Sequence, residues 1–386
     1  MTEPFIVFGK PDIQEAELAE VEACLKSKWL GTGPRVAKFE ANFAEYKGVS
    51  PSNVAAVNSC TAALHVSMIA AGLKPGAEVI TTPLTFCATI NSIIHAGLTP
   101  VLADIDPQTQ CIDPDAIEAA ITPRTEAILP VHFAGQPCDM DRIMAIAKKH
   151  KLLVIEDCAH SLETKYKGQH VGTFGDFGCF SFYVTKNVTT GEGGMVIGRS
   201  ESDIARVKTL ALHGMSKDAW HRFSDTGYKH YQVVECGFKY NMMDLQAAIG
   251  IHQLARVTDN WNRRRAIWNH SQTEFSDLNL TLPKNPAKNV THAYHLYTIL
   301  TNGRNGSIER DCFLDRLNEH GIGAGVHYLS IPEHSYYATR FGWNAEQWPV
   351  AKKIGQETVS LPLSPGINEL DLKRIVTTVR DIMQPG

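Results

Sequence analysis

The chain has 386 residues, of which 44% are hydrophobic and 20% are charged, so it can form a sizeable core and shows no sign of disorder. Its 37 basic and 41 acidic side chains leave a net charge of -4, which argues against a surface for nucleic acid. The nine cysteines form no C-x-x-C pair, so they are typical of reduced thiols in a cytoplasmic protein and not of a disulfide framework.

One uncharged stretch, residues 79–103, is long enough to cross a bilayer. It contains Pro83, Gly97 and Pro100, and these interruptions favour a buried strand–helix–strand unit. Glu3 stands where a signal peptide would need a basic residue. We therefore expect neither a membrane segment nor a secretion signal.

Short apolar runs alternate with helical patterns along the first two-thirds of the chain. Helices are expected between the runs, for example at residues 85–96 and 139–150. This alternation predicts an α/β fold with a mostly parallel central sheet, whose ligands bind beyond the carboxyl ends of the strands. The expected strands are residues 78–81, 100–104, 127–131 and 152–157.

After about residue 200, the alternation of apolar runs and helical patterns becomes less regular. Residues 244–265 predict one long helix that ends in a cluster of three arginines, which we interpret as a solvated helix end. Residues 294–300 predict a strand, and residues 307–320 a helix that Ser307 caps. We expect a large domain at residues 1–260 with an N-terminal arm, and a smaller C-terminal α/β domain at residues 261–386.

Four features follow strands of the first domain. Residues 58–63 begin a helix whose free N–H groups suit a phosphate, although an ordinary helix cap is the commoner explanation. Asp157 ends a buried strand, where an unpaired carboxylate is costly. It would either pair with a cationic ring nitrogen or cap the next helix. Lys186 follows an apolar run and is either a desolvated nucleophile or a solvated surface charge. The glycines of residues 189–194 permit a tight turn and do not form a P-loop.

Each feature is weak alone, but together they are the parts of a pyridoxal 5'-phosphate site. The helix start would bind the phosphate, Asp157 would keep the pyridine nitrogen protonated, and Lys186 would bind the aldehyde. No metal is expected, because His292 and His295 lie in a predicted strand and form no metal-binding helix motif.

Several longer motifs occur in order along the chain, and they resemble those of the DegT/DnrJ/EryC1/StrS family of sugar aminotransferases. The resemblance extends from residue 28 to residue 363 and implies the type I fold of pyridoxal-phosphate enzymes. The most specific motifs are IEDCAH at 155–160, FSFYVTK at 180–186, TGEGG at 190–194 and GFKYNMMD at 237–244.

The resemblance implies a role for each matching position around the cofactor. Lys186 would hold the cofactor and move the proton between it and the substrate carbon, and Asp157 would pair with the ring nitrogen. Asn241 would reach the phosphate in the neighbouring subunit, so a homodimer with a shared site is implied. The other expected cofactor contacts are Phe86 stacked on the ring, His160 on the ring or its phenolic oxygen, and Cys60, Thr61 and Ser181 at the phosphate.

The expected substrate contacts are less specific. Trp29 and Thr32 lie in a glycine-bracketed loop that would close over the sugar, and His327 and Tyr328 match a segment that borders the sugar nucleotide, although a plain strand fits them nearly as well. Tyr183 stands where the lipid A branch of the family has histidine, which would alter sugar contacts. Cys60 replaces a small alanine, which should matter little because the backbone binds the phosphate.

Residues 127–135 and 212–220 are most similar to the branch that aminates C4 of UDP-linked 4-keto sugars. The expected reaction moves the amino group of L-glutamate to that carbon, with pyridoxamine phosphate as the intermediate form of the cofactor. A C3 aminotransferase, a pyridoxamine-dependent sugar dehydratase and a noncatalytic regulator are the alternatives. Lys186 argues against the dehydratase, whose members carry histidine at that position.

Overall fold

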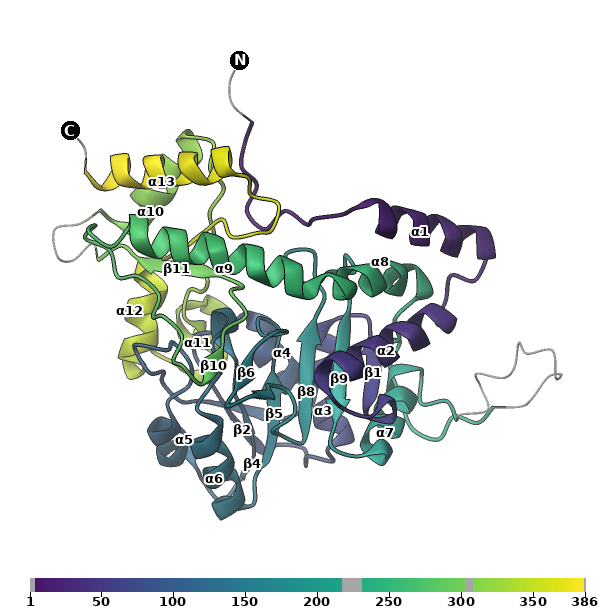
Figure 1. The fold of residues 1–386 in the computed structure, drawn as a ribbon. Helices are drawn as coiled ribbons and strands as arrows, with labels where there is room; N and C mark the ends of the chain where they lie inside the picture. Colours follow the sequence, from purple (N-terminus) through teal and green to yellow (C-terminus); the bar gives the residue numbers. More distant parts are fainter. Residues whose placement is uncertain (1–3, 217–230, 303–307, 385–386) are drawn as a thin grey trace.

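The computed structural model describes residues 4–216, 231–302 and 308–384, and a seven-stranded sheet forms its centre (Figure 1). Strand β9 runs antiparallel to both of its neighbours, β1 and β8, and the other pairs are parallel, so the predicted α/β fold with a mostly parallel sheet is confirmed. The strands in spatial order are β1 (Val54–Val57), β9 (Gly194–Gly198), β8 (Phe177–Ser181), β5 (Leu153–Asp157), β4 (Thr125–Leu129), β2 (Glu78–Thr81) and β3 (Thr99–Leu102).

Helices cover both faces of this sheet because successive residues of its strands are buried on opposite sides. Val79 packs in the cluster under α3 (Cys60–Ala70) and α7 (Glu201–Ala211), whereas Ile80 packs in the cluster under α5 (Pro114–Ala120) and α6 (Met140–His150). Strands buried on both faces read as continuous apolar runs, which is why they were predictable. The remaining helices of this region are α1 (Glu15–Ser27), α2 (Pro34–Lys47), α4 (Cys87–His95) and α8 (Asp244–Ala255), with short 3-10 turns at Pro51–Asn53 and Phe133–Gly135.

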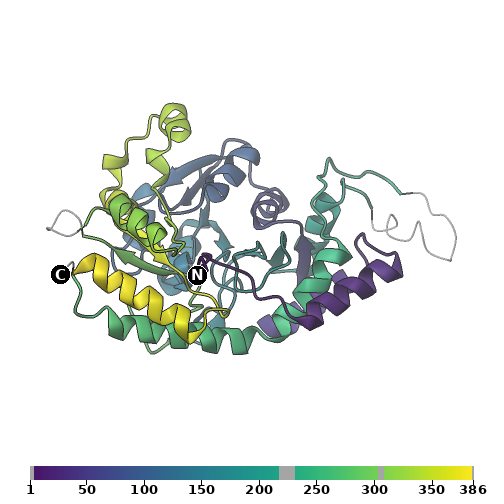
Figure 2. The same cartoon turned by 90° about the horizontal axis from the view of Figure 1, so that it is seen from above.

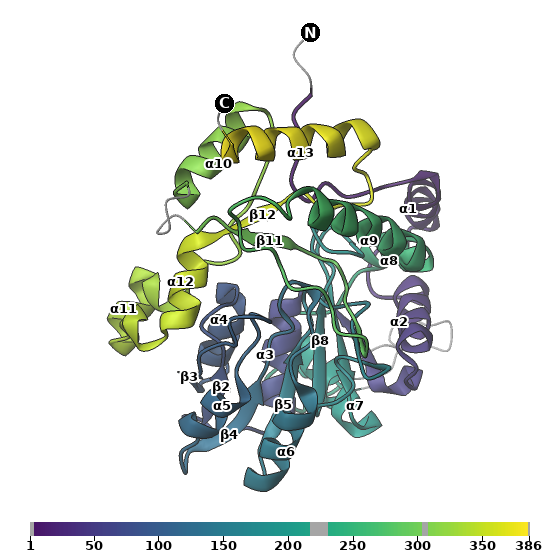
Figure 3. The ribbon, with the colours of Figure 1, turned by 60° about the vertical axis from the view of Figure 1, so that its left-hand side comes forward.

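The C-terminal region lies beyond one end of the large sheet (Figures 1 and 3). Its core surrounds the antiparallel pair β11 (Tyr297–Leu300) and β12 (Thr358–Leu361). A small sheet of β10 (Val290–Thr291), β6 (Lys165–Tyr166) and β7 (Gln169–His170) connects the two regions. The helices are α9 (Val257–Glu274), α10 (Arg310–Glu319), α11 (Ser335–Phe341), α12 (Pro349–Glu357) and α13 (Glu369–Met383), with 3-10 turns at Ile331–Glu333 and Ala345–Gln347.

The N-terminal arm pairs with this C-terminal region, and its Gly9 also packs against Thr185 of the large domain. Ile6 forms a parallel bridge with Ile322, through hydrogen bonds from Ile6 N to Gly321 O (2.9 Å) and from Gly323 N to Ile6 O (2.8 Å). Figure 2 shows the arm passing among the helices of the C-terminal region before it continues into α1. The arm is thus shared between the two predicted domains.

Two details differ from the sequence-based expectations. The helix expected at residues 244–265 is two helices, α8 and α9, because Arg256 leaves helical geometry with φ -107° and ψ 17°. Arg264 does not lie on a solvated helix end: it is 1% exposed and ion-paired with Glu163 in the interior. Ser307 lies outside the described residues. Helix α9 continues through residue 260, and the domain boundary placed there remains a prediction.

No helix within residues 4–216, 231–302 and 308–384 combines the length and the apolar character needed to span a bilayer. The uncharged stretch at residues 79–103 instead contains β2, α4 and β3. All nine cysteines are free thiols, and most of them are buried.

Candidate active site

A cavity of about 640 Å³ opens at the carboxyl ends of β5 and β8 and is closed on its other side by the C-terminal region. Ten of the thirteen residues predicted for the site line it: Cys60, Thr61, Phe86, Asp157, His160, Ser181, Tyr183, Lys186, His327 and Tyr328. Residues that were not predicted also line it, among them Phe8, Gly9, Glu192 and His295. The topology therefore assembles most of the candidate residues around one space.

The amino end of helix α3 forms the anion-binding part of the cavity. The Ser59 hydroxyl caps the helix by accepting a hydrogen bond from Ala62 N (3.1 Å), whereas no described group accepts from the N–H of Cys60 or Thr61. Gly194 at the start of β9 packs against this turn, and a Cβ there would lie 2.5 Å from the carbonyl carbon of Ser59. A glycine is therefore required where β9 meets the helix start.

Asp157 ends strand β5, and the residue is 4% exposed. One carboxylate oxygen accepts a hydrogen bond from Ala159 N (3.1 Å) and the other from the Thr89 hydroxyl (2.9 Å). Burial raises the pKa of this carboxyl, and these two hydrogen bonds offset only part of that effect. The carboxylate thus has capacity for one more partner, and a cationic group in the cavity would stabilise its charged form.

Lys186 lies on a turn five residues beyond the end of β8, where its N–H donates to Tyr183 O (2.9 Å). Its ammonium has no hydrogen-bond partner among the described residues, and burial lowers its pKa to about 8. The uncharged amine, which a nucleophile toward an aldehyde requires, is therefore much more populated near neutral pH than in an ordinary lysine.

Aromatic and imidazole groups surround this lysine. His160 Nε2 lies 3.1 Å from the Tyr328 hydroxyl, and the Phe86 ring centroid is 5.8 Å from that of Tyr328. Burial lowers the pKa of His160 well below its usual value, and burial also lowers the pKa of His327 to about 4. Phe86 is 56% exposed although it is a large apolar ring, which leaves one face available for stacking.

Three predicted residues lie outside this cavity: Trp29, Thr32 and Asn241. Thr32 donates to Met242 O (2.5 Å) and accepts from Asn241 Nδ2 (2.7 Å), while Trp29 folds over its own loop and donates to Thr32 O (3.1 Å). These residues form a separate cluster, and their roles at a shared site remain predictions.

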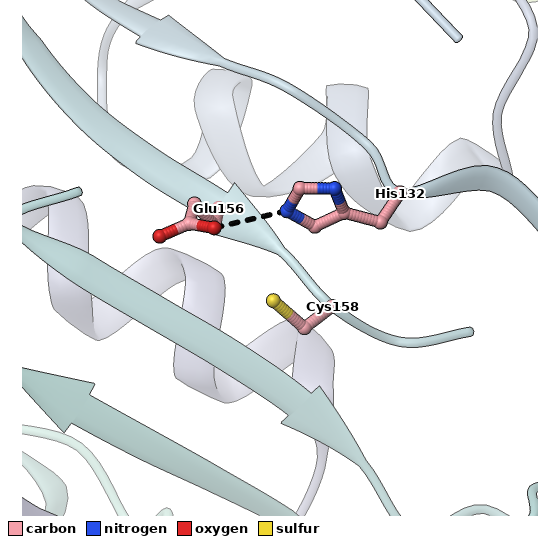
Figure 4. A group of neighbouring side chains, drawn as sticks. All are labelled: His132, Glu156 and Cys158. Carbon is pink, nitrogen blue, oxygen red and sulfur yellow. Dashed lines mark hydrogen bonds and ion pairs between the residues drawn. The ribbon is translucent and has the colours of Figure 1, made fainter. Parts of the chain in front are cut away.

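A second buried polar cluster lies behind the strand end and consists of His132, Glu156 and Cys158 (Figure 4). Their donor atoms lie within 4.8 Å of one another, as in a metal site, but His132 and Glu156 are already engaged in hydrogen bonds. His132 Nδ1 accepts from Cys138 N (3.1 Å), so Nε2 carries the proton that it donates to Glu156 Oε2 (3.0 Å). The same carboxylate accepts from Gly172 N (2.7 Å), Phe174 N (2.8 Å) and Gly175 N (2.7 Å). This network fixes the strand that carries Asp157.

Comparisons with known proteins agree with this geometry. Residues 11–380 match the DegT/DnrJ/EryC1/StrS aminotransferase family. The chain belongs to this family. It is 44% identical to the spore coat polysaccharide biosynthesis protein SpsC of Bacillus subtilis over 381 residues, which are 98% of this chain and 97% of the relative.

Solved structures of the family show the same fold. The putative sugar aminotransferase Spr1654 of Streptococcus pneumoniae in its PMP form has a TM-score of 0.91 at 31% identity, over 98% of this chain and 99% of that one. PseC of Helicobacter pylori, an aminotransferase involved in the biosynthesis of pseudoaminic acid, has a TM-score of 0.91 at 28% identity over the full length of both chains. The protein is therefore a pyridoxal-phosphate-dependent sugar aminotransferase.

The residues present fit pyridoxal phosphate. The unpaired N–H groups of Cys60 and Thr61 offer an anion site, and the Gly194 contact preserves it. Asp157 and Lys186 line the same cavity, Asp157 buried and Lys186 partly exposed, and neither side chain forms an ion pair with a described residue. A phosphorylated, cationic aromatic aldehyde supplies all three partners at once.

Proposed function

We propose that the cofactor is held by the residues that line this cavity. Lys186 would bind it covalently, Asp157 would face its ring nitrogen, and Phe86 would cover its ring. Support comes from the exposed ring of Phe86 and from the raised pKa of Asp157. The remaining contacts would come from Cys60 N, Thr61, Ser181 and His160, with Asn241 from a partner subunit.

The bound cofactor supplies an electron sink that stabilises a carbanion next to the transferring nitrogen. The chain itself supplies the proton transfer and the alignment. Lys186 Nζ, with its lowered pKa, would take a proton from the substrate carbon that carries the nitrogen. It would then deliver a proton to the carbon on the other side of that nitrogen. Asp157, held by Ala159 N and the Thr89 hydroxyl, keeps its charge directed into the cavity. The rings of Phe86 and Tyr328, with centroids 5.8 Å apart, would border the cofactor.

We infer that the acceptor is the C4 keto group of a UDP-linked sugar, that the donor is L-glutamate, and that the product serves surface glycan or lipopolysaccharide synthesis. The observation that carries the sugar assignment is the lining of the cavity: it is rich in hydroxyl and imidazole groups and contains no arginine among the described residues. Hydroxyl and imidazole groups can both donate to and accept from the hydroxyl groups of a sugar ring. The choice of UDP, C4 and glutamate rests on residues 127–135 and 212–220, of which 217–220 lie outside the described residues.

The proposal includes a homodimer with a shared site. Asn241 Oδ1 is buried without a hydrogen-bond partner in the described part of the chain. Large apolar side chains near it are exposed, including Met243 (43%) and Trp29 (50%), which is typical of a surface that another chain covers. The nine free thiols support a reducing, cytoplasmic location.

A substrate panel tests this function directly. Purified protein with pyridoxal phosphate and L-glutamate is given UDP- and dTDP-linked 4-keto and 3-keto sugars, and products are identified by mass and by NMR coupling constants. Amination of a UDP-4-keto sugar is expected. Activity on dTDP sugars alone, or on 3-keto sugars alone, contradicts the substrate assignment. Loss of water without amino transfer would indicate a dehydratase.

A further inference from the structure

His295 lines the same cavity as Lys186 and has no part in the cofactor contacts proposed above. It comes from the segment between β10 and β11, which the 3-10 turn Phe133–Gly135 holds in place. His295 N donates to Ala134 O (3.2 Å), and Ala293 N donates to Gly135 O (3.1 Å). The imidazole is 6% exposed, so the fold buries a titratable ring beside the reacting lysine.

The hydrogen bonds of Asn187 fix the tautomer of this ring. Asn187 follows Lys186 directly, and its Nδ2 donates to Glu163 Oε2 (2.8 Å) and to Ala293 O (3.0 Å). Both of these partners only accept, so the orientation of the amide is determined. The Asn187 Oδ1, which lies 3.0 Å from His295 Nδ1, must therefore accept a proton from that nitrogen.

A buried ion pair makes this arrangement rigid. Glu163 is 4% exposed, and its other carboxylate oxygen pairs with Arg264, which is 1% exposed. A turn of the Asn187 amide would place its oxygen against this carboxylate, so the geometry requires the Nδ2 donor on that side. The consequence is that His295 carries its proton on Nδ1 and has a lone pair on Nε2.

His295 remains an uncharged acceptor in the cavity. Burial, and after it the charge of Lys186, lowers its pKa well below the usual value. The neighbouring His160, with ring centroids 4.5 Å apart, has the opposite polarity: its Nδ1 accepts from Ala134 N (3.3 Å), so its Nε2 donates to Tyr328. Within the described part of the chain, no group donates to His295 Nε2.

The two substrates differ in what they can offer to this lone pair. Apart from its transferring nitrogen, an amino-acid donor presents carboxylate oxygens, which accept and which a lone pair repels. A keto sugar presents hydroxyl groups, which donate. We infer that His295 is a specificity-determining residue that accepts a hydrogen bond from the sugar hydroxyl next to the keto carbon; this rests on the proposed function.

The two half-reactions separate this role from a structural one. H295F keeps a flat ring against His160 but removes the acceptor, H295Q restores an acceptor, and H292F is the matched control in the same segment. His292 is 3% exposed and does not line the cavity. In H295F the glutamate half-reaction should stay within about twofold of wild type, while the keto-sugar half-reaction should slow by roughly 10- to 100-fold. H295Q should recover part of that loss. H292F should change the rates of the two half-reactions equally or should change neither.

A sugar analogue tests the hydroxyl itself. The keto sugar that is active in the panel is compared with its analogue without the hydroxyl next to the keto carbon, on wild type and on H295F. Removing the hydroxyl should slow wild type and leave H295F unchanged within about twofold. Equal slowing of the two enzymes, or equal loss in both half-reactions of H295F, would overturn the inference. If no keto sugar reacts with wild type, the proposed function fails instead, and direct binding of the nucleotide sugar to wild type and H295F then decides whether His295 contacts it.

Discussion

Two carboxylates stand next to each other at the end of β5 and serve different purposes. Glu156 is surrounded by four hydrogen-bond donors, from His132 and three backbone N–H groups, and has no open position. Asp157 receives only two hydrogen bonds and faces a cavity. Because adjacent side chains of a strand point to opposite faces, one strand end supports the fold on one side and leaves a binding position open on the other. A buried carboxylate whose hydrogen-bonding positions are all filled thus indicates a structural role, and one with an open position indicates a binding site.

The largest effect is expected from Lys186 in the open cavity. K186A should lower turnover by roughly 10³- to 10⁴-fold, because no other described amine lines the cavity to bind the aldehyde and carry the proton. The cofactor should still bind, but without a covalent link, and this is checked by borohydride reduction and mass spectrometry. Near wild-type turnover in K186A would contradict the role of this lysine.

The next largest effect is expected from Asp157. D157N should slow turnover by roughly 100-fold or more, because the ring nitrogen loses its anionic partner. The folded-state pKa of Asp157 is raised, so its charge destabilises the cofactor-free fold at neutral pH, and D157N should not lower the unfolding free energy. Kinetics and urea unfolding measure the two quantities. A clear loss of unfolding free energy in D157N would show that Asp157, like Glu156, stabilises the fold.

Glu156 should show the reverse pattern. E156Q replaces one acceptor with an amide that faces N–H donors, so the unfolding free energy should fall by about 2–4 kcal/mol. The folded fraction should retain its cofactor absorbance. Urea titrations of E156Q and D157N in parallel test the comparison, and unchanged stability in E156Q would refute it.

A smaller effect is expected from pH acting on Lys47. This buried lysine donates to Leu162 O (2.7 Å) and lies 4.2 Å from the Phe180 ring centroid, and burial lowers its pKa from 10.5 to about 8. Between pH 8 and pH 10.5 the unfolded chain therefore binds more protons than the folded chain. The unfolding free energy should consequently rise as the pH increases through this range and fall as the pH decreases. K47M should reduce the slope of this part of the stability curve, measured by urea unfolding without cofactor, and should leave the share that comes from Lys186, whose pKa is also lowered to about 8. An equal slope in both proteins would exclude Lys47 as its source.

The smallest effect is expected from Cys60. Its side chain lies at the helix start, but the backbone N–H is the group proposed to contact the phosphate. C60A should keep turnover and the affinity for pyridoxal phosphate within about twofold, as measured by cofactor titration. A tenfold loss of affinity would show that the thiol itself takes part.

Much of this arrangement was predictable from sequence because it depends on local patterns. Asp157 and Ser181 end continuous apolar runs, and runs of that kind form strands buried on both faces. The break between α8 and α9 was not predictable, since neither glycine nor proline marks it and Arg256 is an ordinary helix former.

Long-range contacts account for the residues that were missed. Phe8 lines the cavity because its segment pairs with residues 321–323, and no local pattern records such a pairing. Arg264 resembled a surface charge because its partner, Glu163, is 101 positions away in the chain. His295 was noticed only as part of a possible metal pair. Its preceding loop and the buried Glu163 determine its tautomer, and both require the fold.

The cavity has a consequence for synthesis of the protein. Its lining runs from Phe8, near the start of the chain, to Leu363, close to its end. A ribosome must therefore make almost the whole polypeptide before the walls of the cavity can meet. Any prematurely terminated product that lacks β12 and the residues after it is without the strand that pairs with β11 and without the Leu363 wall of the cavity.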